Sequence, residues 1–210
     1  NEQSSNVILS LSKDLEFSSM DSRLRGNDKG NNEVQILPIK SVGVQGDGRT
    51  YRHPAAIYLS DKKINWDELD KASVGITNSS KEVNRVVLCL SHKEPQNFIT
   101  EKSYITPERI QKLQEADAIA QKLLHDWESE NNPVEKVWQF PVVLLPLVNE
   151  KGEECIVLRP IHSQEAMTAE FARLPEELLE KMTKSILGIK GIGAVFYDLT
   201  HKPPGTIEWE

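Results

Sequence analysis

The stretch Asn84-Arg85-Val86-Val87-Leu88 has the same place in the first half of the chain that Gly193-Ala194-Val195-Phe196-Tyr197 has in the second. Both stretches are short apolar runs of the kind that forms buried β-strands. Two β-rich stretches and an amphipathic helix precede each of them. The sequence therefore predicts an α+β fold of two related small modules, each built as strand, strand, helix and strand, and an internal duplication would explain the repeat.

In the first half, the dipeptide Asp47-Gly48 is typical of a tight hairpin turn. We expect strands at Pro38–Gln45 and Thr50–Leu59 on its two sides. The other elements expected in this half are a short helix at Trp66–Ala72, a second helix near Ser80–Val83 and a buried strand at Val86–Leu90.

A long helix is predicted between the two halves, because Thr106 and Pro107 are a helix N-cap and a first-turn proline. It should end near Trp127. Its predicted inner face consists of Ile110, Leu113, Ala120, Leu124 and Trp127.

The second half is predicted to contain strands at Trp138–Val148 and Cys155–Ile161, joined by the polar turn Asn149–Gly152. Pro175 should open a helix, and a last strand is expected at Ala194–Leu199. The connections between the predicted strands are too short for many parallel crossovers. The expected inner positions of the helix are Leu178, Leu179, Met182, Ile186 and Leu187.

Residues 1–33 differ in composition from the rest of the chain, with many Asn, Ser, Asp, Gly and Lys residues and few apolar ones. Ser18–Gly30 looks like the translated product of a bacterial interspersed repeat. So little apolar surface cannot offset the loss of chain entropy, and we expect disorder here. The predicted organisation is a repeat-like segment at 1–33, a first module with the long helix at 34–130, and a second module at 131–210.

The composition is that of an ordinary globular protein, with 38% hydrophobic and 27% charged residues. A net charge of −7 argues against a nucleic-acid partner, which needs a basic surface. No apolar run approaches the length of a membrane span, and no signal peptide is apparent. Cys89 and Cys155 lie in apolar runs and are expected to be buried thiols in the cytoplasm, although a disulfide stays possible.

Two segments are candidate ligand sites, and each has a simpler alternative. The glycines and Arg49 of Val44–Arg49 could bind an anion, or they could form a plain hairpin turn, which hairpin statistics favour. The Gln139 amide could recognise the edge of a base, or it could be exposed on a strand, which is the more frequent case. Met167 and Phe171 are expected in the core or in an interface.

The C-terminal stretch Lys202–Glu210 predicts a docked tail, because Trp209 offers a large apolar face that gains from being covered. Docking would place Lys202 and Glu208 at fixed points, as recognition of a charged ligand requires. The histidines lack the spacing of a zinc site. The sequence also has no phosphate-binding Gly-Lys-Ser/Thr loop, no nucleophile elbow and no catalytic Cys–His pattern, so it is typical of a binding or assembly module.

Three separated motifs, Ser41–Tyr51, Gln139–Val142 and Tyr197–Glu210, together resemble the C-terminal part of glutamine-hydrolysing GMP synthase. Asn84–Val87, Arg159–Ile161 and Met167-Thr168 fit the same family. The resemblance covers about residues 36–210, and the long middle portion is similar to the form with two tandem dimerisation modules.

The resemblance implies the dimerisation and XMP-binding portion of an enzyme that converts XMP to GMP with ATP, Mg²⁺ and ammonia from glutamine. It implies a homodimer, and glutaminase and ATP-pyrophosphatase domains supplied in cis or in trans. No residue of this chain is then catalytic by itself. A rival hypothesis is a dimeric remnant that binds no nucleotide. The residues that the family motifs assign to XMP are Arg49, Gln139, Lys202 and Glu208.

Overall fold

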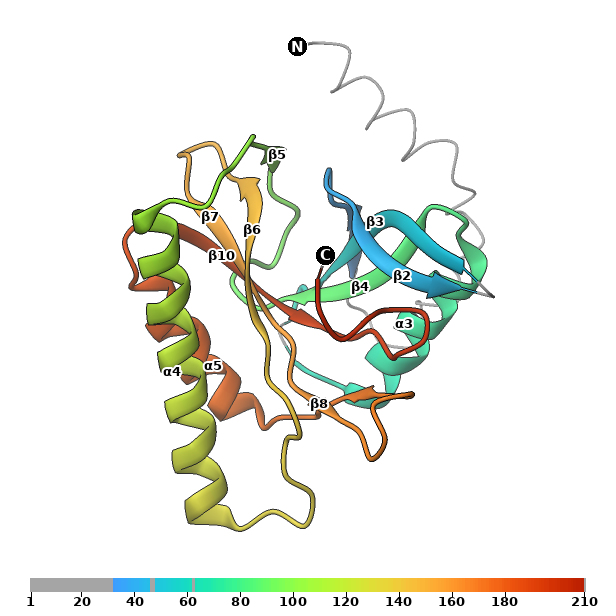
Figure 1. The fold of residues 1–210 in the computed structure, drawn as a ribbon, viewed down its shortest axis with the longest axis vertical. Helices are drawn as coiled ribbons and strands as arrows, with labels where there is room; N and C mark the ends of the chain where they lie inside the picture. The colour runs from blue at the N-terminus through green and yellow to red at the C-terminus, as the bar shows by residue number, and fades with distance from the viewer. Residues whose placement is uncertain (1–31, 46–47, 62, 210) are drawn as a thin grey trace.

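The fold is described by a computed structural model that covers residues 32–45, 48–61 and 63–209 (Figure 1). The segment predicted to be disordered, 1–33, lies outside these residues except for Asn32 and Glu33. Glu33 is the first residue of strand β1.

The described residues form a mixed sheet with three helices, which confirms the predicted α+β class. Eight strands form the main sheet in the order β1-β3-β4-β10-β7-β6-β5, with β2 paired to β3, and β8 and β9 form a separate pair. The strands are β1 Glu33–Ile36, β2 Ser41–Gln45, β3 Gly48–Tyr58, β4 Val83–Cys89, β5 Ile99–Thr100, β6 Val142–Val148, β7 Glu154–Leu158, β8 Ile161–His162, β9 Glu170–Phe171 and β10 Ile192–Asp198. The helices are α3 Trp66–Ser79, α4 Pro107–Asn131 and α5 Glu176–Leu187.

The predicted repeat of strand, strand, helix and strand is confirmed as β2-β3-α3-β4 and β6-β7-α5-β10. In both halves the first two strands are antiparallel, and the helix returns the chain to a parallel strand. The two last strands, β4 and β10, pair antiparallel at the centre. The halves thus share one sheet, and the module boundary near residue 130 stays a prediction.

Helix α3 is longer than predicted, and the prediction of a second helix near Ser80–Val83 is wrong. Asn65 caps the start of α3 by accepting a hydrogen bond from the Glu68 N–H. Further along, the Ser73 hydroxyl donates to the Leu199 carbonyl at 3.0 Å, so the helix continues over the sheet instead of ending at Ala72. Val83 already belongs to β4, all of whose residues are buried.

Strand boundaries differ from the predictions where pairing partners change. The strand expected from Trp138 begins only at Val142, because Gln139 pairs in an isolated bridge with Ile161. Strand β1 was not predicted. It pairs along β3 at the edge of the sheet, where Glu33 lies opposite Tyr58.

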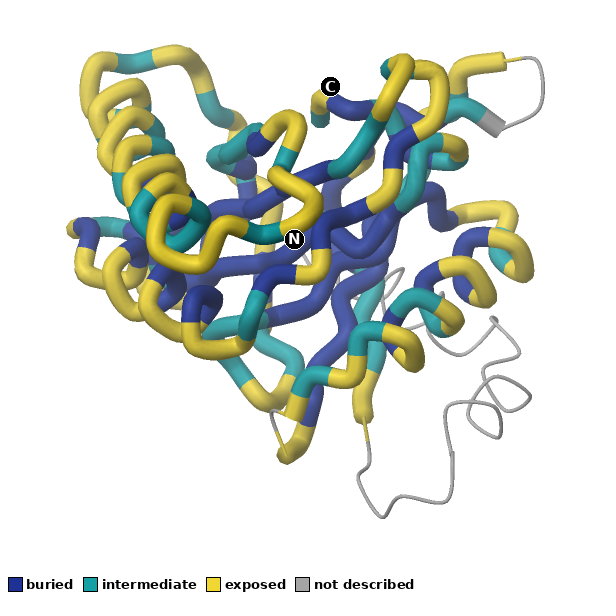
Figure 2. The backbone as a smooth tube through the Cα atoms, turned by 90° about the horizontal axis from the view of Figure 1, so that it is seen from below, coloured by how far each residue is buried: buried dark blue, intermediate teal, exposed yellow. Residues whose placement is uncertain are grey.

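The three helices pack on one face of the sheet and form the larger core (Figure 2, dark blue band). Helix α4 contributes Ala116, Ala120 and Leu124 to it. The predicted inner positions Ile110 and Leu187 are wrong, since 44% and 36% of their surface is exposed near the helix ends.

Among the described residues, the opposite face of the sheet is packed by loops and by the tail rather than by a helix. Leu37, Ile39, Phe98 and Trp209 pack against it. Cys89 and Cys155 lie on this face as buried thiols that form no disulfide among the described residues, as predicted.

Candidate functional site

The C-terminal tail, residues 200–209, lies docked between strand β2 and the β8–β9 pair (dark red in Figure 1). Lys202 exchanges two backbone hydrogen bonds with Ala169, at 2.8 and 3.1 Å. On the other side the Val44 N–H donates to the Pro204 carbonyl at 2.7 Å. The prediction of a docked tail is therefore confirmed as far as Trp209.

Gly43 makes this close approach possible. A Cβ atom at this position would lie 2.7 Å from the Pro204 carbonyl oxygen and 2.8 Å from Nδ2 of Asn84. Asn84 in turn joins β4 to β2, since its amide donates to the Ser41 carbonyl at 2.7 Å. Any larger residue at position 43 would displace either the tail or this contact.

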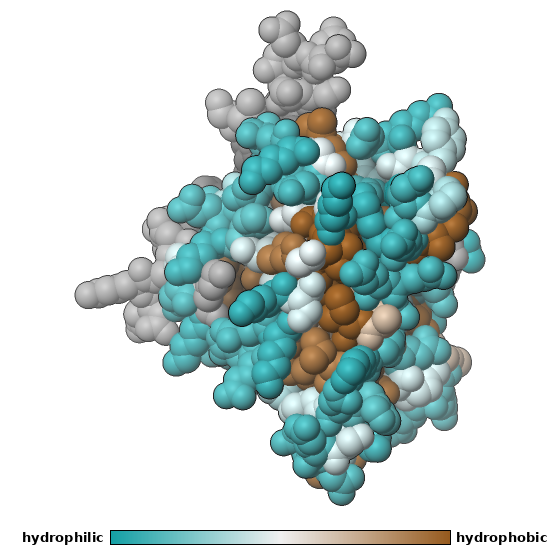
Figure 3. Space-filling model, turned by 90° about the vertical axis from the view of Figure 1, so that its left-hand side faces the viewer, coloured by the Kyte–Doolittle hydropathy of each residue, from teal (hydrophilic) through white to brown (hydrophobic). Residues whose placement is uncertain are grey.

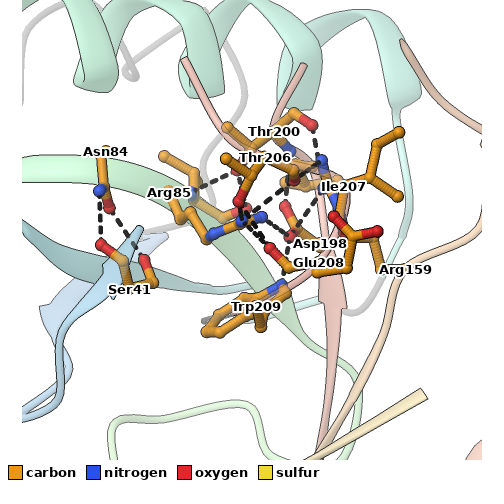
Figure 4. Close-up of polar contacts among 12 residues, drawn as sticks. Ser41, Asn84, Arg85, Arg159, Asp198, Thr200, Thr206, Ile207, Glu208 and Trp209 are labelled. Atoms are coloured by element: carbon orange, nitrogen blue, oxygen red, sulfur yellow. Dashed lines mark hydrogen bonds and ion pairs between the residues drawn. The ribbon is translucent and has the colours of Figure 1, made fainter. Parts of the chain in front are cut away.

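Beneath the tail lies a buried cluster of Arg85, Arg159 and Asp198, which we call the tail clamp (Figure 4). All three side chains are fully buried. Oδ2 of Asp198 accepts from Nη1 of Arg85 at 2.9 Å and from Nη1 of Arg159 at 2.8 Å. Two positive charges and one negative charge leave a net positive charge in the interior, which is costly unless other polar groups solvate it.

The tail supplies that solvation with its backbone carbonyls. Arg159 donates from Nε to the Ile207 carbonyl and from Nη2 to the Thr206 carbonyl, both at 2.8 Å. Arg85 donates from Nη2 to the carbonyls of Thr206 at 3.0 Å and Glu208 at 2.8 Å. The clamp and the tail therefore stabilise each other.

Trp209 contacts two members of the tail clamp, Asp198 and Arg85. Its indole Nε1–H donates to Oδ2 of Asp198 at 2.7 Å, and the Arg85 guanidinium lies 4.8 Å from the ring centroid, in range of a cation–π contact. Burial raises the pKa of Asp198, but Arg159 and Arg85 outweigh it, and the net pKa lies below the ordinary value of 3.8. Asp198 thus keeps its charge at neutral pH.

Of the four residues assigned to XMP, Lys202 and Glu208 lie on the docked tail. Lys202 is half-buried, and its ammonium donates to the Ala166 carbonyl at 2.6 Å. The Glu208 carboxylate is exposed, while the backbone carbonyl of the same residue is held by Arg85.

Arg49 and Gln139 come from distant segments but join the same framework. Arg49 is exposed on β3 opposite Val44, the residue that binds the tail at Pro204. Gln139 is exposed and pairs with Ile161 of β8, whose partner strand β9 follows the tail contact at Ala169. Backbone pairing therefore connects the segments that carry Arg49 and Gln139 to the tail that carries Lys202 and Glu208, and we call these four residues the rim.

The simpler alternatives for these segments are partly confirmed. Gln45 and Gly48 pair across a hairpin, although residues 46–47 lie outside the described part. Phe171 is buried as predicted, whereas Met167 is 75% exposed and is not in the core.

The roles of Arg85, Arg159 and Asp198 were not predicted, although all three lie in the quoted motifs. A signal was present, because an arginine inside an apolar strand is tolerated only when it is paired. The partners could not be read from the sequence, since Asp198 lies 113 residues beyond Arg85.

Fold and site together define an α+β domain whose own C-terminal tail is docked between its strands and is held by a buried cluster of charged side chains. The profile of the family described as GMP synthase C-terminal domain matches residues 31–98 and 128–209, and the chain belongs to this family. Strand β5 and most of helix α4 lie between the two matched segments.

Relatives support the same assignment. A probable glutamine-hydrolysing GMP synthase of Leptospira interrogans is 40% identical over 178 residues, covering 84% of this chain and 28% of the relative. A probable enzyme of the same name from Caenorhabditis elegans is 37% identical, covering 98% of this chain and 29% of the relative. The GMP synthase of Dictyostelium discoideum is 31% identical, covering 99% and 31%. The chain thus spans less than a third of the length of these relatives, and the recognition of the family from its motifs is confirmed.

No helix within residues 32–45, 48–61 and 63–209 has the length and apolar character to cross a bilayer. The same residues contain no group of three His, Cys, Asp or Glu side chains arranged to hold a metal ion.

Proposed function

We propose that this chain is the dimerisation and XMP-binding portion of a glutamine-hydrolysing GMP synthase, which makes GMP from XMP in purine biosynthesis. The observation that carries the proposal is the docked tail, which holds Lys202 and Glu208 in one framework with Arg49 and Gln139. The names of the relatives point to the same reaction.

The side chains of the rim match the chemistry of a purine nucleotide. The guanidinium of Arg49 and the ammonium of Lys202 suit the phosphate. Lys202 uses one of its three N–H donors on the Ala166 carbonyl and keeps donors for a ligand. The Gln139 amide, with a donor and an acceptor, suits the base edge, and the Glu208 carboxylate suits the ribose hydroxyls.

The proposal assigns ATP and Mg²⁺ to the ATP-pyrophosphatase domain of the complete enzyme, as the resemblance to the family implies. Ammonia would come from the glutaminase domain. Both domains act in cis or in trans, and this chain contributes binding and orientation of XMP.

Calorimetry of XMP binding tests the proposal, both on the chain alone and with the ATP-pyrophosphatase domain supplied separately. Arg49→Ala and Lys202→Ala should each weaken binding by about 1.5–3 kcal/mol, the range for charged hydrogen bonds. Lys190→Ala, an exposed lysine just after α5, is the matched control and should bind as the parent chain does. Absence of binding in both settings would favour the rival hypothesis of a remnant.

The proposed dimer is supported by apolar surface on the side of α4 and α5 (Figure 3). Just before and at the start of α4, Tyr104, Ile105 and Ile110 are 63%, 88% and 44% exposed. Sedimentation equilibrium should show a dimer that Ile105→Asp shifts toward monomer, because a charge in an apolar contact is costly. An unchanged dimer in this variant would exclude this surface, and Val134→Asp, at another exposed apolar residue, is the control.

A further inference from the structure

We infer that the tail clamp and Thr206 are positioning residues for the nucleotide site, so that XMP affinity depends on buried groups that do not touch the nucleotide. The inference rests on the proposed function of the rim. It concerns how the tail residues Lys202 and Glu208 are held, and it adds a second set of residues to the four that the family motifs assign.

The clamp holds the tail on both sides of the Lys202–Gly205 turn. Before the turn, Oδ1 of Asp198 accepts from the Thr200 N–H at 2.8 Å, and Arg159 donates to the Thr200 carbonyl at 3.1 Å. After the turn, the two arginines bind the carbonyls of Thr206, Ile207 and Glu208. Lys202 lies two residues after the clamped Thr200, and Glu208 is itself held through its carbonyl, so the positions of both follow that of the clamp.

The clamp itself is rigid, because its members lie on or directly after three neighbouring strands. Arg85 lies on β4, Asp198 ends β10 and Arg159 follows β7. These strands are adjacent in the sheet. Side chains on paired strands are held more precisely than side chains on loops, so the sheet can transmit a fixed geometry to the tail.

The arginines also make docking of the tail nearly all-or-none. Each guanidinium carries five N–H donors, and Asp198 alone cannot accept hydrogen bonds from all the donors of two guanidinium groups. Nε of Arg85 has no hydrogen-bond partner among the described residues even when the tail is docked. Loss of the tail carbonyls would leave several more buried donors unpaired, which disfavours partly docked states.

Conservative substitutions of Thr206 can test this arrangement. Its hydroxyl accepts from Nη2 of Arg85 at 2.7 Å and donates to the Glu208 carbonyl at 2.6 Å. The hydroxyl therefore connects the backbone carbonyl of Glu208 to Arg85 of the clamp through two hydrogen bonds. Thr206→Val removes it at nearly constant shape, and Thr206→Ser retains it.

The experiment compares these two variants in the full chain by XMP calorimetry and by the ¹⁵N–¹H spectrum of the indole groups. The chain has four tryptophans, and Trp209→Phe identifies the Trp209 signal. We expect Thr206→Val to weaken XMP binding at least tenfold and to move the Trp209 Nε1–H signal toward that of a free indole. Thr206→Ser should stay within about threefold of the parent chain. Circular dichroism establishes that both variants are folded at the assay temperature.

The outcomes separate this inference from the proposed function. If Thr206→Val moves the Trp209 signal and XMP binding is unchanged, the positioning role is overturned and the nucleotide site stands. If the parent chain binds no XMP, with or without the ATP-pyrophosphatase domain, the proposed function fails and the inference fails with it. If Thr206→Val does not fold, Gly43→Ala displaces the Pro204 contact from outside the clamp and should produce the same two changes.

Discussion

Asp198 accepts hydrogen bonds from two arginines, an indole and a backbone N–H, and these contacts determine both its charge and its structural role. An arginine in an apolar strand could be noticed in the sequence. The convergence of Arg85, Arg159 and Asp198 could not, because it depends on which strands become neighbours. Prediction from the sequence therefore named exposed residues of the motifs and missed the buried residues that bind the tail.

Stability toward acid should depend on Asp198. Since its pKa in the folded state lies below 3.8, the ionised form stabilises the protein above about pH 4, and this stabilisation is lost as the pH falls through the folded-state pKa. At pH 7, Asp198→Asn should cost about 3–5 kcal/mol, because it leaves buried arginines unpaired. Urea denaturation between pH 6 and pH 2 should show a weaker acid dependence in Asp198→Asn than in the parent chain, and equal slopes would contradict the assignment.

At the scale of elements, helix starts were predictable and lengths were not. Thr106 caps α4 and Pro107 follows it as predicted, because capping is local chemistry. The extent of α3 depends on the contact of Ser73 with Leu199, which is 126 residues away in the chain. The predicted inner face of α4 is confirmed at Ala120 and Leu124, which are buried, and is wrong at Ile110, which is 44% exposed near the start of the helix.

Two glycines provide a matched test at this scale. Gly75 lies in the exposed interior of α3, and a Cβ atom there would have no neighbour within 4 Å. Gly75→Ala should raise the free energy of unfolding by about 0.5–1 kcal/mol, because alanine loses less backbone entropy on folding. Gly43→Ala should lower it, because the added Cβ meets the tail. Thermal melts of the two variants check both signs, and a stabilising Gly43→Ala would show that the tail can move aside at no cost.

For the whole molecule, the order of elements in each half was predictable, whereas their union in one sheet was not. The periodicity of apolar residues and the turn signals are local, and no local signal predicts that β4 pairs with β10, for example Leu88 with Tyr197. The same limit applies to the clamp, whose three members are far apart in the sequence although the fold brings them together at one end of the adjacent strands β4, β10 and β7.

The shared sheet predicts cooperative unfolding of both halves. Because β4 and β10 are adjacent central strands, neither half keeps its sheet if the other unfolds. Urea titrations followed by circular dichroism and by the fluorescence of Trp66 in the first half and Trp209 in the tail should coincide in one transition. Two separated transitions would instead support modules that fold independently on either side of residue 130.

The antiparallel pairing of β4 and β10 also shows how the two halves have specialised. Ile57 pairs with Leu88 in one half as Leu158 pairs with Tyr197 in the other, so Tyr58 and Cys89 are the counterparts of Arg159 and Asp198. The first half fills these places with uncharged groups, and the Tyr58 hydroxyl is satisfied by Gln35. The two halves thus share one backbone arrangement, with uncharged side chains at these two positions in the first half and charged side chains in the second. Among the described residues, the ionic cluster that binds the tail therefore occurs once per chain, despite two similar halves.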